Sequence, residues 1–181
     1  EALQGPDALC VVDCSHDLAQ PGLGRSQYEA AHIPGAVHAH LDRDLSGPTT
    51  GRNGRHPLPS PESLARWLGQ QGIDPGMRVV AYDRSGSMYA ARLWWMLRWI
   101  GHSAVQVLDG GLAAWTAAGQ ATESGAVARP ARPYPAAQAD AALTVDAAYV
   151  LAHLHTPHAV LVDARGAGRY AGESVDDVCF H

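Results

Sequence analysis

Residues 79–87 read Val-Val-Ala-Tyr-Asp-Arg-Ser-Gly-Ser, and their pattern indicates the fold class of the chain. Its first four residues form a short apolar run, which is typical of a buried parallel strand. The polar residues and Gly86 that follow indicate a loop. A strongly helical segment then runs from about Met88 to Ile100, and Gly101 ends it. A strand, a loop and a helix in immediate succession predict an α/β domain with a parallel sheet.

The segments on either side repeat this alternation. We expect further strands at residues 8–13, 33–37 and 105–108, and helices at 27–32, 61–71 and 112–118. Residues 41–58 are rich in Gly and Pro and are predicted to form a long loop. In a parallel sheet the loops at the carboxyl ends of the strands are where a functional site is expected.

The composition excludes several classes of function. The 181 residues include 13 basic residues, all of them arginine, and 18 acidic ones, which gives a net charge of −5. A mildly acidic chain without a basic run is not expected to bind nucleic acid in general. Without lysine, the chain can use neither Schiff-base chemistry nor a P-loop lysine. No apolar stretch of about 18 residues is present, so no membrane span is expected. Three cysteines are too few for a disulfide scaffold and indicate a reducing, cytoplasmic setting.

The carboxyl-terminal part of the chain has a different character. Residues 121–142 are rich in Pro and Ala without an apolar period, so we expect a linker there. A helix at 145–154 and a strand at 159–163 follow, and this strand ends in Val-Asp, as the strand at 8–13 does. Such pieces recur in many α/β proteins, so these residues alone do not establish an internal repeat.

Four segments together carry a more specific resemblance. The first is Val12-Asp13 followed by Arg25 to Ala36, which contains His-Ile-Pro-Gly-Ala. The second is Val79 to Gly86, and the third is Ala91 to His102, which with the preceding Ala90 reads AARLWWMLRWIGH. The fourth is Leu108 to Gly119, which contains Leu-Asp-Gly-Gly and Trp115. In this order and spacing the segments resemble the rhodanese family, and specifically the first domain of two-domain thiosulfate or 3-mercaptopyruvate sulfurtransferases. The resemblance implies a rhodanese-like α/β fold, a parallel five-stranded sheet with helices on both faces. It also implies a domain over 1–120, a linker over 121–142, and the start of a second, truncated rhodanese-like domain over 143–181.

The family's active loop has the pattern C-x-x-G-x-[RT]-[AS], and its cysteine carries sulfur as a persulfide. Here Asp83 stands at the nucleophile position and Gly86 keeps its place, while Met88 and Tyr89 replace the last two pattern residues. A carboxylate cannot carry a persulfide, so we expect no catalytic residue in this loop. Asp83 could instead accept a phosphoryl group, but such sites need a second acid for magnesium, and the loop supplies none.

The remaining cysteines offer no replacement, because Cys10, Cys14 and Cys179 all lack the loop pattern. In relatives the arginine of a G-R-[YF] pattern helps to hold the anionic sulfur donor, and Arg169 matches that position. Arg169 is therefore a substrate-binding candidate. The alternative is an ion pair of Arg169 with Asp163 or Glu173.

Other candidate groups are expected to be structural. His38 with His40, and His153 with His155, could each chelate on an extended strand, but two histidines are a weak signal and we expect no metal and no cofactor. The aromatic side chains Trp94, Trp95 and Trp99 are expected to cover the sheet. Arg25, Arg92 and Arg98 are expected to make structural pairs.

Two hypotheses follow. In the first, the chain is a piece of a sulfurtransferase whose intact form moves sulfane sulfur from thiosulfate or 3-mercaptopyruvate, small anionic donors, to a thiol or cyanide. The chain itself would then lack the catalytic cysteine loop and be inactive. In the second, it is a non-catalytic rhodanese-like module that binds a partner or a small anion. The sequence leaves the donor and the oligomeric state open.

Overall fold

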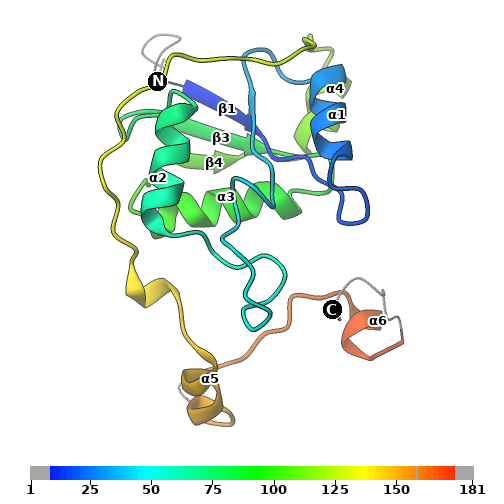
Figure 1. Cartoon of the computed structure of the whole chain (residues 1–181). Helices are drawn as coiled ribbons and strands as arrows, with labels where there is room; N and C mark the ends of the chain where they lie inside the picture. The colour runs from blue at the N-terminus through cyan, green and yellow to red at the C-terminus, as the bar shows by residue number, and fades with distance from the viewer. Residues whose placement is uncertain (1–8, 158, 174–181) are drawn as a thin grey trace. The chain divides into compact units, whose positions relative to one another are not determined.

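The computed structural model describes residues 9–157 and 159–173 (Figure 1). The chain forms two compact units, Glu1–Ala139 and Asp140–His181. The strands of the first unit are β1 (Leu9–Asp13), β2 (Val37–His38), β3 (Arg78–Tyr82) and β4 (Val105–Val107). Its helices are α1 (Leu23–Ala30), α2 (Pro61–Gln70), α3 (Met88–Trp99) and α4 (Gly111–Ala117). Cys179 lies outside the described residues.

The sheet is entirely parallel, with the strand order β2-β1-β3-β4. β1 and β3 are central, and Asp13 is paired in register with Tyr82. Our expectation of five strands is not met in the described part of the chain, where the sheet has four. The only other bridge there joins His32 to Glu123 in antiparallel fashion. The segment around Glu123 lacks an apolar run, so it has no buried face with which to extend the sheet.

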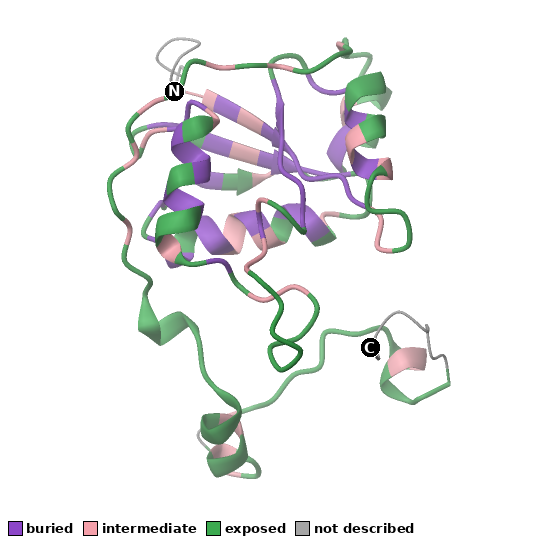
Figure 2. Ribbon diagram, in the orientation of Figure 1, coloured by how far each residue is buried: buried purple, intermediate pink, exposed green. Residues whose placement is uncertain are grey.

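Helices cover both faces of the sheet, as expected for an α/β domain. Alternate residues of a strand point to opposite faces. On one face Cys10 and Val12 join a large core built from the apolar sides of α2 and α3, and Figure 2 shows this interior as buried. On the other face Tyr82 packs with Ile33 and with Leu112 of α4 in a smaller cluster.

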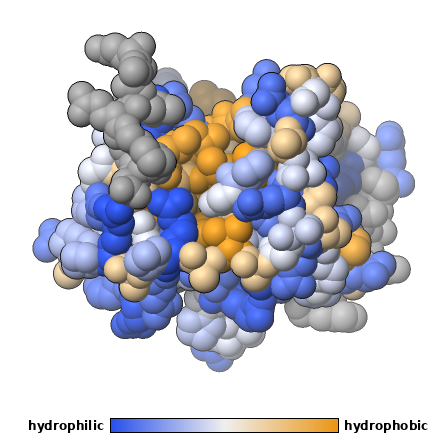
Figure 3. All heavy atoms as spheres, turned by 90° about the horizontal axis from the view of Figure 1, so that it is seen from above, coloured by the Kyte–Doolittle hydropathy of each residue, from blue (hydrophilic) through white to orange (hydrophobic). Residues whose placement is uncertain are grey.

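The smaller cluster is less completely covered than the main core. Its neighbours Val11, Leu108 and Trp115 stay partly exposed. Seen from above, hydrophobic side chains gather in the middle of the molecular surface (Figure 3).

The structure groups residues 121–139 with the first unit, although the sequence predicted a linker from 121. The amide of His32 donates to the carbonyl of Glu123, and the amide of Glu123 donates to that of His32, each at 2.9 Å. Further along, Arg132 contacts Asp74 at 2.8 Å and the hydroxyl of Tyr134 lies 3.0 Å from His102 Nδ1. These side chains tie an extended, proline-rich segment to the first unit.

The second unit contains η2 (Ala141–Leu143), α5 (Ala147–His153) and α6 (Ala167–Tyr170). The predicted helix at 145–154 is present as α5, and the Asp146 side chain caps it by accepting from the Tyr149 amide at 2.7 Å. The predicted strand at 159–163 is not formed. Val160, Leu161 and Val162 are 86%, 71% and 77% exposed. A strand needs partners, and the described residues of this unit provide none.

Candidate functional site

The loop between β3 and α3 is organised around the side chain of Asp83, which is 2% exposed. Its Oδ1 accepts from the amides of Ser85 and Ser87 at 2.8 and 2.9 Å. Its Oδ2 accepts from the amides of Tyr89 and Ala90 at 2.8 and 2.9 Å. Both oxygens of one carboxylate thus satisfy four backbone donors, including those of the first turn of α3.

The backbone of the loop is shaped to turn these donors inward. Gly86 and Ser87 have φ of 68° and 71°, so two consecutive residues are left-handed. Successive amides in such a turn form a concave anion-binding nest. Ser87 is the N-cap of α3 but its side chain makes no capping hydrogen bond. The carboxylate of Asp83 fulfils the capping role and also meets the positive end of the α3 dipole.

This loop is therefore an anion-binding loop whose anion is part of the same chain. Sequence reasoning placed Asp83 at the nucleophile position and Gly86 beside it, and the structure brings both into the loop after β3. Sequence reasoning expected a structural loop with inward-pointing amides. It did not anticipate that the Asp83 carboxylate itself accepts from four of them, because their convergence depends on the left-handed backbone at Ser87, a residue type that rarely adopts it.

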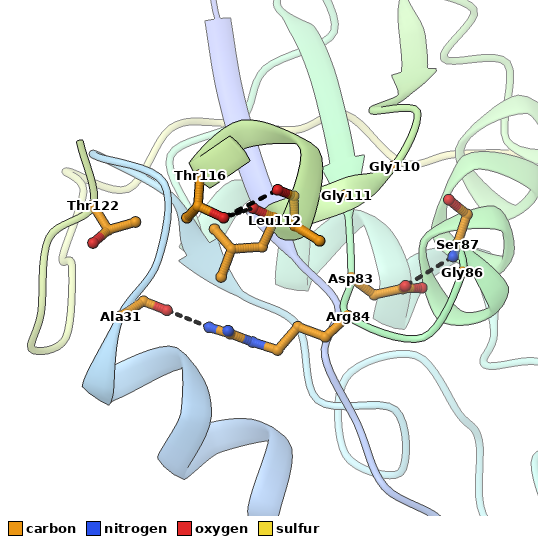
Figure 4. A pocket seen from close by; sticks show the side chains of 11 residues that line it. Ala31, Asp83, Arg84, Gly86, Ser87, Gly110, Gly111, Leu112, Thr116 and Thr122 are labelled. Carbon is orange, nitrogen blue, oxygen red and sulfur yellow. Dashed lines mark hydrogen bonds between the residues drawn. The ribbon is translucent and has the colours of Figure 1, made fainter. Parts of the chain in front are cut away.

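A cavity of about 470 Å³ lies beside the loop (Figure 4). It is lined by the Asp83 loop, by the turn before α4 with the first residues of that helix, and by Ala31 and Thr122. The side chain of Arg84 extends across the cavity toward α1 (Figure 4). Its guanidinium donates to the carbonyl of Gln27 at 3.0 Å and to that of Ala31. The positive charge is thus held against the carbonyl end of α1.

Gly111 allows the α4 turn to approach the loop closely. It has φ of 54°, and a Cβ at this position would overlap the carbonyl oxygen of Asp83. The amide of Leu112 lies 3.4 Å from that same oxygen. The Leu-Asp-Gly-Gly motif, which follows β4, thus packs against the loop between β3 and α3. Only glycine fits at the last position of the motif, Gly111.

The two described cysteines are free and buried. Burial raises the pKa of Cys10 to about 11, although the charge of Arg129 opposes this shift. Burial raises the pKa of Cys14 well above its usual value, and the negative charges of Asp13 and Asp83 raise it further. A thiol in either place stays protonated at neutral pH, so neither side chain is a ready nucleophile.

The histidine pairs from the sequence do not converge as chelates. His38 Nε2 bonds the Ser15 carbonyl at 3.1 Å, and His40 Nδ1 accepts the Asp42 amide at 3.2 Å. In the second unit His153 stacks on the ring of Tyr149. A different set, His16, Asp42 and His56, does come together. Sequence reasoning did not single out this set, because its members lie in three separate segments with no motif spacing.

Arg169 lies in α6 of the second unit. The nearby Asp163 contacts Arg165 at 2.6 Å. The pKa of Asp163 falls to about 2, first because of its hydrogen bonds with Arg165 and, as a smaller cause, because of the positive charge of Arg169. The alternative of a local charge pairing for Arg169 thus has support, and its role toward a substrate stays a prediction.

The other arginines of the first unit make structural contacts, as predicted. Arg25 pairs with Glu29 at 2.6 Å. Arg92 donates to the carbonyls of the long loop, at 2.7 Å for Leu45. Arg98 lies over the ring of Trp94, 5.2 Å from its centroid. None of these three guanidinium groups lines the cavity beside Asp83.

Comparisons with known proteins fit this geometry. The family model of the rhodanese-like domain matches residues 1–118. The chain is 44% identical to a probable 3-mercaptopyruvate sulfurtransferase of Pseudomonas aeruginosa over 99% of the chain and 64% of that protein. It is 36% identical to the human 3-mercaptopyruvate sulfurtransferase over 95% of the chain and 59% of that protein. It superposes on the 3-mercaptopyruvate sulfotransferase SseA of Escherichia coli with a TM-score of 0.79 at 31% identity, covering 93% of the chain and 63% of SseA.

The chain thus spans a little under two thirds of these relatives. None of the described helices is long and apolar enough to cross a membrane. The parallel sheet, the loop after β3, the glycine turn before α4 and the match over residues 1–118 agree with one another: the chain belongs to the rhodanese family.

Proposed function

We propose that this chain contributes the non-catalytic rhodanese-like domain of a two-domain sulfurtransferase. The intact protein would transfer sulfane sulfur from thiosulfate or 3-mercaptopyruvate to a thiol or cyanide. The names of the relatives support the reaction class. The observation that carries the non-catalytic assignment is the carboxylate of Asp83, whose two oxygens occupy all four inward-facing amides of the loop.

The chemistry explains why this loop is unsuited to sulfur transfer. A cysteine thiolate attacks the outer sulfur of thiosulfate, the S–S bond breaks, and sulfite leaves with the electron pair. The acceptor then attacks the outer sulfur of the resulting persulfide, so that cyanide becomes thiocyanate and the thiolate returns. The loop at Asp83 has no thiol, and the Asp83 carboxylate already occupies the amides that would otherwise hold an anionic donor. Cys10 and Cys14 are buried and protonated.

Residues 143–181 are proposed to begin a second rhodanese-like domain. The exposure of Val160, Leu161 and Val162 supports this, because such an apolar run is expected to be a strand of a sheet. In that setting Arg169 would help to hold the oxyanion of the donor. The free thiols of Cys10 and Cys14 suit a reducing compartment, and we include a cytoplasmic location in the proposal.

Steady-state assays of the 181-residue chain test the proposal. Thiocyanate formation from thiosulfate and cyanide, and pyruvate formation from 3-mercaptopyruvate, should both stay at the level of the buffer. The matched control is the chain with Cys10→Ser, Cys14→Ser and Cys179→Ser, which should behave identically. Turnover that the wild-type chain shows and the cysteine-free chain lacks would overturn the assignment of an inactive domain.

A second function is favoured by the cavity beside Asp83. In this alternative the chain is a binding or regulatory module, and the cavity takes a small ligand. Ala113 is exposed and lines the cavity, so Ala113→Phe fills it without touching the core. Saturable binding of thiosulfate by calorimetry that disappears in Ala113→Phe would support this function. Equal heats in both proteins would exclude it for this cavity.

A further inference from the structure

Three side chains with metal-binding chemistry meet at the carboxyl edge of the sheet. His16 follows β1, Asp42 follows β2, and His56 lies in the loop before α2. One ligand atom from each lies within 4.8 Å of those of the other two. Asp42 Oδ1 lies 2.9 Å from His56 Nε2, and Asp42 Oδ2 lies 3.9 Å from His16 Nε2. The carboxylate thus presents one oxygen to each imidazole.

Hydrogen bonding within the group accounts for Asp42 and His56 but not for His16. Its side chain is 1% exposed. Within the described residues its Nε2 is buried and has no hydrogen-bond partner. A buried polar nitrogen without a partner lowers stability unless a further group binds it. That nitrogen faces the side chain of Asp42, which is 39% exposed and opens the group to solvent.

We propose that His16, Asp42 and His56 bind one divalent transition-metal ion, with zinc as the preferred occupant. Two imidazoles and one carboxylate are a common zinc ligand set. Zinc bonds of 2.0–2.1 Å to nitrogen place neighbouring tetrahedral ligand atoms about 3.3 Å apart. The distances from the Asp42 oxygens to the histidine nitrogens, 2.9 Å for His56 and 3.9 Å for His16, lie on either side of that value.

Zinc binding requires the ligand atoms to shift, and the loop that holds His56 is best able to make this movement. The ligand atoms of the three side chains lie within 4.8 Å of one another, and the nitrogens of His16 and His56 would settle at about 3.3 Å on binding. His56 follows the exposed run 51–55, whereas His16 is fixed in the interior. Movement of the loop toward His16 closes the triangle without disturbing the sheet.

His40 and Tyr89 hold the group without completing it. His40 Nδ1 already accepts the Asp42 amide at 3.2 Å, which fixes the backbone of that ligand. The ring of Tyr89 packs edge-on against His16 with centroids 5.4 Å apart. With three protein ligands, a water molecule would fill the fourth position. The bound ion would fasten the long loop 41–58 to the strand ends.

Zinc titration of the full 181-residue chain tests this site. The chain, with Cys179→Ser in every sample to remove a competing thiol, is stripped with a chelator and titrated against a chromophoric zinc indicator. We expect one zinc per chain. His16→Gln and Asp42→Asn should each weaken binding at least about 100-fold, because each removes one of three ligands. His153→Gln, in the second unit, is the matched control and should leave the affinity unchanged.

Two further measurements separate loss of a ligand from loss of the fold. The far-ultraviolet circular dichroism spectrum of each variant must match that of the wild-type chain. Asp42→Asn is expected to meet this requirement, because the side chain of Asp42 is partly exposed. Zinc should raise the thermal midpoint of the wild-type chain and leave that of Asp42→Asn unchanged. Absence of zinc binding at micromolar protein, or wild-type affinity in either variant, would overturn the proposal.

Discussion

The replacement of Asp83 by asparagine isolates the contribution of its negative charge. Asparagine has almost the same shape, but it offers one acceptor oxygen where aspartate offers two. If that oxygen keeps the amides of Ser85 and Ser87, the side-chain NH₂ group faces the amides of Tyr89 and Ala90. Two donors then point at two other donors, and the charge that complemented the α3 dipole is lost.

The expected cost follows from those two bonds. A hydrogen bond to a charged group contributes about 1.5–3 kcal/mol, and relaxation of the loop recovers part of the sum, so we expect Asp83→Asn to lower the free energy of unfolding by about 3 kcal/mol. Urea unfolding followed by tryptophan fluorescence measures this, because Trp95 and Trp99 lie on α3 directly after the loop.

Asp109 provides the matched control, since it is an exposed aspartate in the loop after β4. Asp109→Asn should change the free energy of unfolding by no more than about 0.5 kcal/mol. If Asp83→Asn costs no more than Asp109→Asn, the loop does not depend on the carboxylate, and the reasoning about the four amides is wrong.

Four further outcomes are expected. Asp83→Cys places a thiol among the same amides, so its pKa should fall below the usual value of about 8.5 and its alkylation rate should stay high at neutral pH, unlike that of Cys14. Gly111→Ala should lower the free energy of unfolding by at least about 2 kcal/mol in urea titrations, because alanine disfavours the left-handed backbone and its methyl group meets the Asp83 carbonyl. Arg132→Gln removes the hydrogen bond that lowers the pKa of Asp74, so that pKa, followed by NMR, should return toward 3.8. The Arg132–Asp74 pair stabilises the fold at pH values above the pKa of Asp74 in the unfolded chain. This stabilisation is lost as the pH falls through the pKa of Asp74 in the folded chain, and at neutral pH it amounts to less than about 1 kcal/mol. Burial lowers the pKa of His102, so stability should fall as the pH drops below 6.5, and His102→Gln should reduce that acid sensitivity in urea titrations.

Much of the first unit was predictable, because its strands are apolar runs and its longest helix is strongly patterned. The start of α1 was missed. The prediction began at residue 27, whereas the helix begins at Leu23. Gly24 explains the miss, because glycine weakens a helical signal. It is needed here because a Cβ at that position would overlap the backbone of Ser15.

Long-range contacts account for the other differences. Residues 121–139 have the composition of a linker, and only the partners of Arg132 and Tyr134 on distant segments show that they pack against the first unit. The position of Asp83 was predictable from the family pattern. That its carboxylate would accept from four of the loop amides was not predictable, because this depends on the left-handed backbone at Ser87. The meeting of His16 with Asp42 likewise depends on the order of β1 and β2 in the sheet.

The first unit is proposed to hold no transferable sulfane sulfur, and mapping of protein-bound sulfane sulfur by mass spectrometry measures this. The 181-residue chain is incubated with thiosulfate or with 3-mercaptopyruvate, trapped with an alkylating reagent and examined by intact-mass and peptide mass spectrometry. We expect no added sulfur atom on Cys10 or Cys14, and an intact mass identical to that of a sample alkylated without a sulfur donor. A persulfide on Cys14 in stoichiometric amount, discharged by cyanide as thiocyanate, would contradict the claim.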